Sequence, residues 1–198
     1  MGRIARTDLL YNDCFAHVFS RSIARHFIFK GQNDFEEFRN LLKEAKQAGE
    51  FSIHHYCLMN THFHMAVNIH NTERFSRALK ELKRTYTYWF NKKYKRFGPL
   101  WRDRFKSMLI EDEEYLYACG QYIENNPVKA GMVKSSEEWL YSSSRFYQLG
   151  KVDDLVDCYQ HGEMPMDVDI NESPMFEKGS GIGSKLFKVL LRQEVGIG

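Results

Sequence analysis

The sequence of 198 residues has no apolar stretch near the roughly 20 residues that a membrane-spanning helix needs. The first six residues, Met1–Arg6, also lack the apolar core of a secretory signal. Its four cysteines are widely scattered, which excludes a CxxC zinc ribbon and gives no disulfide framework. We therefore expect a soluble cytoplasmic protein whose cysteines are buried thiols.

Composition is that of a globular protein, with 43% apolar and 27% charged residues. The length suits one main domain, which we expect over residues 1–150, followed by an acidic tail over 151–198 that contains glycine and proline and a possible short helix at 184–195. Net charge is only +2, yet residues 80–106 hold ten Lys or Arg against two acids, and residues 151–178 hold eight acids against two lysines. A polyanion is the natural partner of the basic stretch; the alternative is that its charges merely solvate a helix and a loop.

Hydrophobic periodicity predicts an α+β fold. Strands are expected at 13–20, 52–59, 62–69 and 105–110, and helices from Asn33 or Asp34 to Gly49, from a cap at Thr72 past Trp89, and from Asp112 to near Pro127. Strand, helix, strand, strand, helix, strand is the βαββαβ plan of ferredoxin-like and RRM-like antiparallel sheets. The last helix, which contains Tyr122, is an addition to that plan.

The stretch His62-Phe63-His64 carries the first chemical motif. Alternation along a strand puts His62 and His64 on one face and the apolar Phe63 and Met65 on the other. The Cα atoms of the two residues would lie about 6.6 Å apart, close enough for both imidazoles to converge on one metal ion. In a chain with eight histidines, an exposed or hydrogen-bonded pair is the alternative.

The added helix carries the second motif. Tyr122 and Asn126 are four residues apart and share a helix face, so a phenol and an amide oxygen would point to the same place. Asn126 could supply the oxygen ligand that a hard divalent ion prefers, and Tyr122 a nucleophile. Tyr117 and Gln121 have the same spacing on the same helix and are the alternative pair. Glu124 is expected at the surface or facing DNA.

Three stretches in this order resemble the single-tyrosine HUH transposases, and among them the REP-associated tyrosine transposase group, named for repetitive extragenic palindromes. The stretches are Tyr56-Cys57-Leu58-Met59-Asn60-Thr61-His62-Phe63-His64-Met65, Gly98-Pro99-Leu100-Trp101-Arg102-Asp103-Arg104-Phe105-Lys106-Ser107 and Tyr122-Ile123-Glu124-Asn125-Asn126-Pro127-Val128-Lys129-Ala130-Gly131. The likeness runs from about residue 13 to about residue 147. One departure is Asn60-Thr61, where the family more often has Pro-Asn.

The resemblance implies metal-dependent nicking and strand transfer of single-stranded DNA beside palindromic hairpins, through a covalent 5′-phosphotyrosine intermediate. It implies Tyr122 as the nucleophile and His62, His64 and Asn126 as ligands of Mg²⁺ or Mn²⁺. The protein would then be associated with the nucleoid, and we expect a monomer, with a dimer as the alternative.

DNA binding is expected from the basic stretch, where cations alternate with aromatic rings on which unpaired bases can stack. The predicted contacts are Lys83, Arg84, Lys92, Lys93, Lys95, Arg96, Trp101, Arg102, Arg104 and Lys106. Trp101 is the expected stacking residue, because Tyr86 and Trp89 fall on the buried stripe of their helix.

Two other functions fit parts of the pattern. A catalytically silent single-stranded nucleic-acid-binding module would need the same basic and aromatic surface, but not the combination of two histidines, a tyrosine and an asparagine. A zinc hydrolase is weaker, because two histidines and an amide make a poor zinc set. The acidic residues 151–178 lead to a further hypothesis, that they fold over the basic surface and compete with DNA; the alternative is a solvated extension.

Overall fold

The computed structural model describes residues 10–159, which form four strands, five α-helices and two short 3₁₀ helices. In chain order the elements are β1 (Cys14–Arg21), η2 (Ile23–Arg25), α1 (Gln32–Gly49), β2 (Phe51–Met59), β3 (His62–Ile69), α2 (Thr72–Lys93), β4 (Lys106–Ile110), α3 (Glu113–Glu124), α4 (Asn126–Lys129), η3 (Ser136–Glu138) and α5 (Ser144–Leu149). Residues 160–178 of the predicted acidic stretch and the predicted helix at 184–195 lie outside the described residues.

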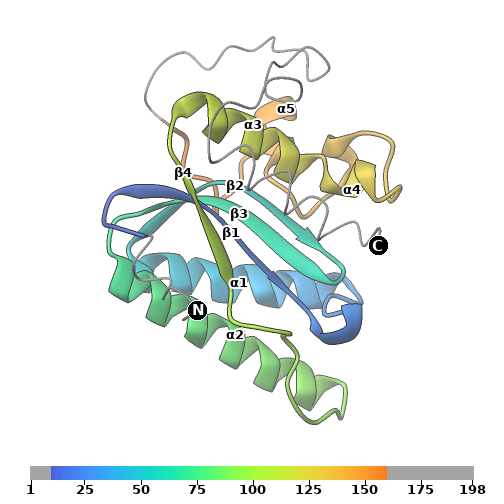
Figure 1. Ribbon diagram of the computed structural model, residues 1–198. Coiled ribbons are helices and arrows are strands. Elements are labelled where there is room, and N and C mark those ends of the chain that lie inside the picture. The colour runs from blue at the N-terminus through green and yellow to red at the C-terminus, as the bar shows by residue number, and fades with distance from the viewer. Residues whose placement is uncertain (1–9, 160–198) are drawn as a thin grey trace, which may run out of the picture. The chain divides into compact units, whose positions relative to one another are not determined.

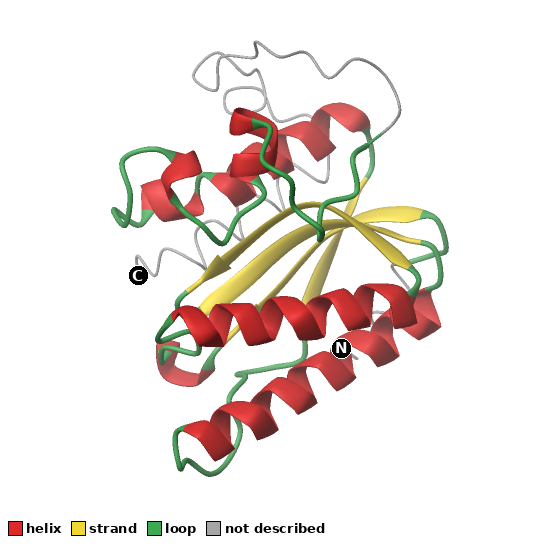
Figure 2. Cartoon of the chain, turned by 180° about the vertical axis from the view of Figure 1, so that it is seen from behind, coloured by secondary structure: helices red, strands yellow, loops and turns green. Residues whose placement is uncertain are grey.

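The four strands form one antiparallel sheet in the order β2-β3-β1-β4. Helices α1 and α2 cover one face of this sheet, and α3, α4 and α5 cover the other (Figures 1 and 2). The predicted ferredoxin-like βαββαβ arrangement with an added helix is thus confirmed. Residues Asn60 and Thr61 make the predicted tight connection between β2 and β3.

The main core lies between the sheet and the pair α1 and α2. On β3 the alternate residues Phe63, Met65 and Val67 are fully buried there. They pack with the apolar stripes of the two helices, which include Phe38 and Leu42 of α1 and Phe75, Leu79 and Tyr86 of α2. Burial of this face leaves the histidines of β3 on the opposite side of the sheet, as the alternation predicts.

Both long helices begin differently from the prediction. The N-cap of α1 is Gly31, and the buried Asp34 instead accepts hydrogen bonds from the backbone amides of Lys30 and Gly31. Asp34 also pairs with Lys93 (2.5 Å), which ties the start of α1 to the end of α2. The N-cap of α2 is Asn71, whose side chain accepts from the amide of Arg74; asparagine is the stronger N-cap residue of the two candidates.

Helix α3 ends at Glu124, earlier than predicted. Asn125 separates the two helices, as the C-cap of α3 and the N-cap of α4. Pro127 lies in the first turn of α4, where the missing amide hydrogen breaks no helical hydrogen bond. The side-chain nitrogen of Asn126 donates to the carbonyls of Tyr122 (2.9 Å) and Ile123 (3.2 Å) and so caps the end of α3. Tyr122 and Asn126 therefore lie on two consecutive helices rather than on one.

A buried polar network holds α3 against the sheet. Glu124 is only 6% exposed, and its Oε1 lies 2.9 Å from Nδ1 of His55 on β2 and 2.7 Å from Oγ of Ser143, which donates to it. Glu124 is therefore not the surface residue that we expected. A buried carboxylate needs such partners, so this network determines where α3 rests.

Residues beyond α4 pack back onto β2, as the aromatic content of 139–147 predicts. Main-chain hydrogen bonds join Leu58 to Tyr141 (2.9 Å) and Ser143 to Tyr56 (3.0 Å), and the ring of Tyr141 stacks on Phe35 at 3.7 Å. Farther along, the amide of Asp157 donates to the carbonyl of Ile53 on β2 (2.7 Å).

The first acids of the predicted tail face α1. Three carboxylates pair with cations of that helix, namely Asp153 with Arg39, Asp154 with Lys43, and Asp157 with Lys46. Residues 151–159 are thus part of the folded unit, and these acids lie on α1 rather than on the basic stretch 80–106. Within residues 10–159, no helix is long and apolar enough to cross a membrane.

The close packing of α3 on β2 predicts a specific response to Gly120→Ala. A Cβ atom at Gly120 would lie 2.5 Å from Nε2 of His55, whose ring is held by Glu124. The substitution should lower the free energy of unfolding in urea by about 1–3 kcal/mol. In a His55→Ala background the same change should instead raise it by roughly 1 kcal/mol, because alanine is the better helix former. Equal effects in the two backgrounds would contradict this packing.

Candidate functional site

On the sheet face beneath α3, three histidines of β1 and β3 lie close together. In the antiparallel pairing of β1 with β3, Arg21 lies opposite His62, Phe19 opposite His64, and His17 opposite Ala66. These side chains therefore share one face of the sheet. His62 and His64 lie side by side on β3 as predicted, with ring centroids 5.0 Å apart and planes nearly perpendicular. His17 on β1 is the member that sequence reasoning missed. Its position in a predicted strand was visible, but its partners on β3 depend on a register that the sequence pattern does not reveal.

Each histidine of β3 is held through its Nδ1 atom. Nδ1 of His62 lies 2.9 Å from Oγ1 of Thr61, and Nδ1 of His64 lies 2.9 Å from Nε2 of His17. Histidines that bind metals in proteins are typically oriented in this way by a partner on the other ring nitrogen. Nε2 is then the nitrogen that each ring could offer to a metal.

Burial keeps the three rings neutral. Loss of solvent lowers the pKa of His17 to about 4, and burial together with the nearby charges of Arg21 and Arg25 lowers the pKa of His62 to about 4. The pKa of His64 is well below its ordinary value because of burial and of His62, His17 and Arg21 around it. Neutral imidazole is the form that binds metals, so the rings are in that form at neutral pH.

Tyr122 reaches this cluster from α3. Its side chain is 8% exposed, and its ring centroid lies 6.1 Å from those of both His17 and His64, edge-on to each. The ammonium group of Lys129 on α4 lies 4.5 Å from the centroid of the same ring. Of the two candidate tyrosines, Tyr122 is thus the one against the histidines. The hydroxyl of Tyr117 accepts a hydrogen bond from Gln121 (2.6 Å), one turn along the helix.

The Nε2 atoms of His62 and His64 suit a hard divalent ion only if an oxygen ligand joins them. Among residues 10–159 no three His, Cys, Asp or Glu side chains are grouped to hold a metal, since the third histidine is hydrogen-bonded to the second. The amide nitrogen of Asn126 is engaged with the carbonyls of α3, so its Oδ1 is the atom it could offer. Two neutral imidazoles suit first-row divalent ions, and an amide oxygen adds the kind of ligand that Mg²⁺ and Mn²⁺ prefer.

Two residues that we expected at the DNA-binding surface are buried. Lys83 is 8% exposed, and its ammonium group donates to Oγ of Ser20 and to the carbonyl of Asp103, both at 2.7 Å. Trp101 is 9% exposed, packs on Phe63, and donates from its indole nitrogen to the carbonyl of Lys83. Both residues therefore fasten the loop before β4 to α2.

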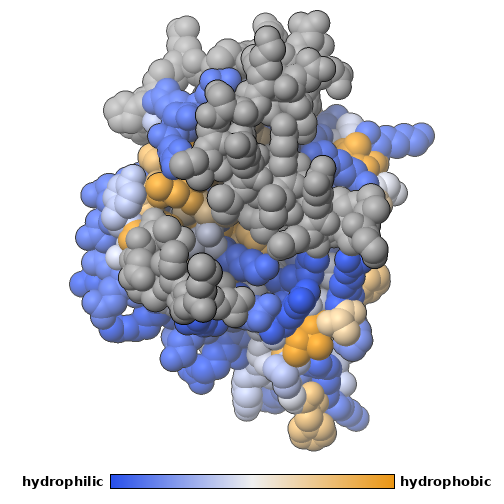
Figure 3. Space-filling model, viewed as in Figure 1, coloured by the Kyte–Doolittle hydropathy of each residue, from blue (hydrophilic) through white to orange (hydrophobic). Residues whose placement is uncertain are grey.

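Other predicted cations have partners within the protein. Lys93 pairs with Asp34, Arg84 pairs with Glu81 on the helix surface, and Arg96 bonds to Asn91. The exposed or half-exposed remainder consists of Lys92, Lys95, Arg104 and Lys106, together with Arg102, whose Nε lies 3.7 Å from Oδ2 of the exposed Asp103. Hydrophilic residues cover most of the described surface that is visible in Figure 3.

Comparison with known proteins adds independent information. Residues 10–126 match the family model described as "Transposase IS200 like". The chain is 31% identical over 118 residues to a Haemophilus influenzae protein named for the REP-associated tyrosine transposases, an alignment that covers 54% of this chain. The chain spans 66% of that relative's length, just under two thirds.

A solved structure shares the fold. It is described as a REP-associated tyrosine transposase bound to a REP hairpin, and it superposes with a TM-score of 0.62 at 20% sequence identity. The match covers 84% of this chain and all of the solved chain.

The buried histidines predict that acid destabilises the metal-free protein. Unfolded His17 takes up a proton below its ordinary pKa of 6.5, whereas the folded protein does so only near pH 4. The free energy of unfolding should therefore be unaffected by this ring above pH 6.5 and should fall by about 1.4 kcal/mol per pH unit between 6.5 and 4.

Urea unfolding in a chelator across this pH range, compared with His17→Phe, isolates the contribution of His17. The variant should show the shallower loss of stability as the pH falls. Identical pH dependence in the two proteins would mean that His17 is not held neutral.

Proposed function

The chain belongs to the IS200-like transposase family, and on this basis we propose that it nicks and rejoins single-stranded DNA at hairpins through a covalent bond to Tyr122. The contact between the Tyr122 ring and the rings of His17 and His64 carries the proposal. It brings together a nucleophile from α3 and imidazoles from two strands. A silent nucleic-acid-binding module would have no use for a tyrosine buried against neutral histidines.

The same site would hold a divalent cation, Mg²⁺ or Mn²⁺, through Nε2 of His62, Nε2 of His64 and Oδ1 of Asn126. When bound, such an ion neutralises charge that develops on the non-bridging oxygens of the scissile phosphate. His17 would serve this site indirectly. When it accepts a hydrogen bond from Nδ1–H of His64, Nε2 of His64 is left with the electron pair that a ligand requires.

Tyr122 would act as the nucleophile. Its phenol oxygen forms a bond to phosphorus, the bond from phosphorus to the 3′ oxygen breaks, and that oxygen leaves as a 3′-hydroxyl after taking up a proton. A phenol has a reference pKa of about 10, so the phenolate needs support at neutral pH. Lys129, whose ammonium group lies 4.5 Å from the centroid of the Tyr122 ring, would supply a cation for this purpose.

Single-stranded DNA would be held by the remaining exposed cations, Lys92, Lys95, Arg102, Arg104 and Lys106. Such contacts with phosphates release counterions, so affinity should fall with salt. The solved chain described as bound to a REP hairpin supports hairpins as the target. Because Glu124 fastens α3 to the sheet of its own chain, one chain holds nucleophile and histidines, which supports a monomer as the active unit.

Loss of the covalent adduct in Tyr122→Phe is the direct test of the proposal. Wild-type protein mixed with Mn²⁺ and single-stranded oligonucleotides carrying the hairpins that flank its gene should give a protein–DNA band on a denaturing gel. Chelator or Tyr122→Phe should abolish the band, because each removes one part of the reaction. Tyr117→Phe is the matched control and should keep it. An adduct that survives in Tyr122→Phe but not in Tyr117→Phe would reverse the assignment.

His17→Phe should weaken the binding of Mn²⁺ without DNA by about 10- to 100-fold, since it removes the group that orients His64. Free Mn²⁺ measured by electron paramagnetic resonance reports this affinity directly. His17→Gln should recover part of it, because its amide oxygen can accept from Nδ1–H. His70→Gln, a change at an exposed histidine, is the control. Unchanged Mn²⁺ affinity in His17→Phe would exclude this role.

A further inference from the structure

The connection from β1 to α1 contains two adjacent residues in the left-handed region. Ala24 has φ 50° and ψ 26°, and Arg25 has φ 55°. Neither is a glycine or an asparagine, the residues that adopt this conformation at little cost. Both side chains are exposed, so burial of apolar surface does not offset the strain.

Main-chain hydrogen bonds hold the strained turn from both sides. Before it, the amide of Ser22 donates to the carbonyl of Thr61 (2.9 Å), and after it, the amide of Ile28 donates to the carbonyl of Asn60 (2.8 Å). Asn60 and Thr61 form the connection that leads directly into His62. The strained turn is thus fixed to the backbone that positions the first histidine of the site.

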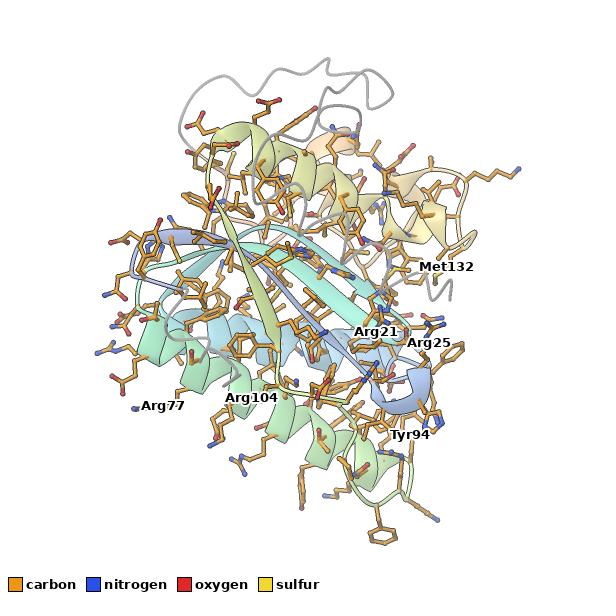
Figure 4. The ribbon with its side chains drawn as sticks, in the orientation of Figure 1. Arg21, Arg25, Arg77, Tyr94, Arg104 and Met132 are labelled. Carbon is orange, nitrogen blue, oxygen red and sulfur yellow. The ribbon has the colours of Figure 1, made fainter. Side chains whose placement is uncertain are left out.

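The turn and the end of β1 bring two guanidinium groups to this place. Arg21 pairs with His62 in the register of β1 and β3 and shares its face of the sheet. Arg25 follows within the turn, and Figure 4 shows Arg21 and Arg25 together at this end of β1. Both charges are close enough to His62 to help lower its pKa. Among residues 10–159, no carboxylate pairs with Arg25.

We propose that Arg21 and Arg25 form an anion-binding edge beside His62 that holds a backbone phosphate of the single-stranded DNA. This inference rests on the proposed function. Because Arg25 has no carboxylate partner among residues 10–159, an anion is its natural partner, and a guanidinium group matches the oxygens of a phosphate with paired hydrogen bonds. Backbone strain that persists at an exposed turn is typical of functional sites, where it fixes a side chain in place.

This edge differs from the DNA-binding surface that the sequence predicts. The predicted surface consists of residues 83–106. The edge belongs to the β1–α1 connection, which borders that surface where the amide of Arg102 donates to the carbonyl of Arg21 (3.0 Å). Its position beside a histidine of the proposed metal site would place the bound phosphate next to the reaction, so that it would orient the strand for attack.

Two variants of Arg25 separate a binding role from a structural role. Arg25→Gln removes the charge and keeps most of the side chain. Arg25→Gly removes the side chain and also relieves the left-handed strain, so it should raise the midpoint of thermal unfolding. If Arg25 served only the fold, Arg25→Gly would lower that midpoint.

Fluorescence anisotropy with a labelled single-stranded oligonucleotide that carries a hairpin, measured in chelator across a salt series, gives the readout. Both variants should bind about tenfold more weakly at low salt, and the slope of log affinity against log salt should shrink by about 0.7, because one phosphate fewer is neutralised by the protein. Arg77→Gln is the control: Arg77 is exposed on α2, pairs with Glu73, and lies apart from Arg21 and Arg25 in Figure 4. It should match wild type.

The outcomes distinguish this inference from the function on which it rests. Wild-type protein that binds no oligonucleotide overturns the proposed function. If the wild-type protein binds the oligonucleotide and Arg25→Gln binds it with the same affinity and the same salt slope, the anion-binding edge is overturned and the proposed function stands. If Arg77→Gln lowered the affinity as much as Arg25→Gln does, the loss would be an effect of net charge alone. That result would also overturn the anion-binding edge.

Discussion

The antiparallel pairing of β1 with β3 is the constraint on which the site depends. This register sets His17, Phe19 and Arg21 on the same face as His64 and His62, while the intervening residues face the core. A slip of one residue would turn every side chain of β1 over and separate His17 from His64. The apolar residues on the other face of both strands prevent that slip, because it would expose them to water. The packing of the core therefore determines the geometry of the polar side.

The two faces of the sheet are held to their helices by different interactions. Toward α1 and α2 the packing is mostly apolar, and apolar substitutions that conserve volume are tolerated there. Toward α3, buried imidazoles, a carboxylate and a phenol must each find partners, so position is determined by hydrogen bonds such as those of His55 with Glu124 and His17 with His64. The helix that carries Tyr122 is thus fixed by specific polar contacts.

Much of the scaffold follows from local patterns, and much of the site does not. Alternation at 62–69 and the short connection before it predict the hairpin and the shared face of His62 and His64, because both depend on neighbours in sequence. The partnership of His17 with His64 joins residues 47 positions apart and needs the strand register. Trp101 stands in a loop without periodicity, so nothing local indicates that its ring turns inward onto Phe63. The burial of Lys83 follows in part from the sequence, since this residue lies between Leu79 and Tyr86 on the buried stripe of α2.

The segments that return to β2 also determine how short a functional piece of this protein could be. β2 is an outer strand of the sheet, and residues 141–143 together with Asp157 occupy main-chain groups along its free side. A fragment that ended just after α4 would keep the histidines of the proposed site, Tyr122 and Asn126, yet would leave that side of β2 open. Open strand edges pair with other chains, so such a fragment would tend to self-associate and to aggregate. Residues 130–159 thus protect an edge of the sheet, although none of them belongs to the proposed catalytic centre.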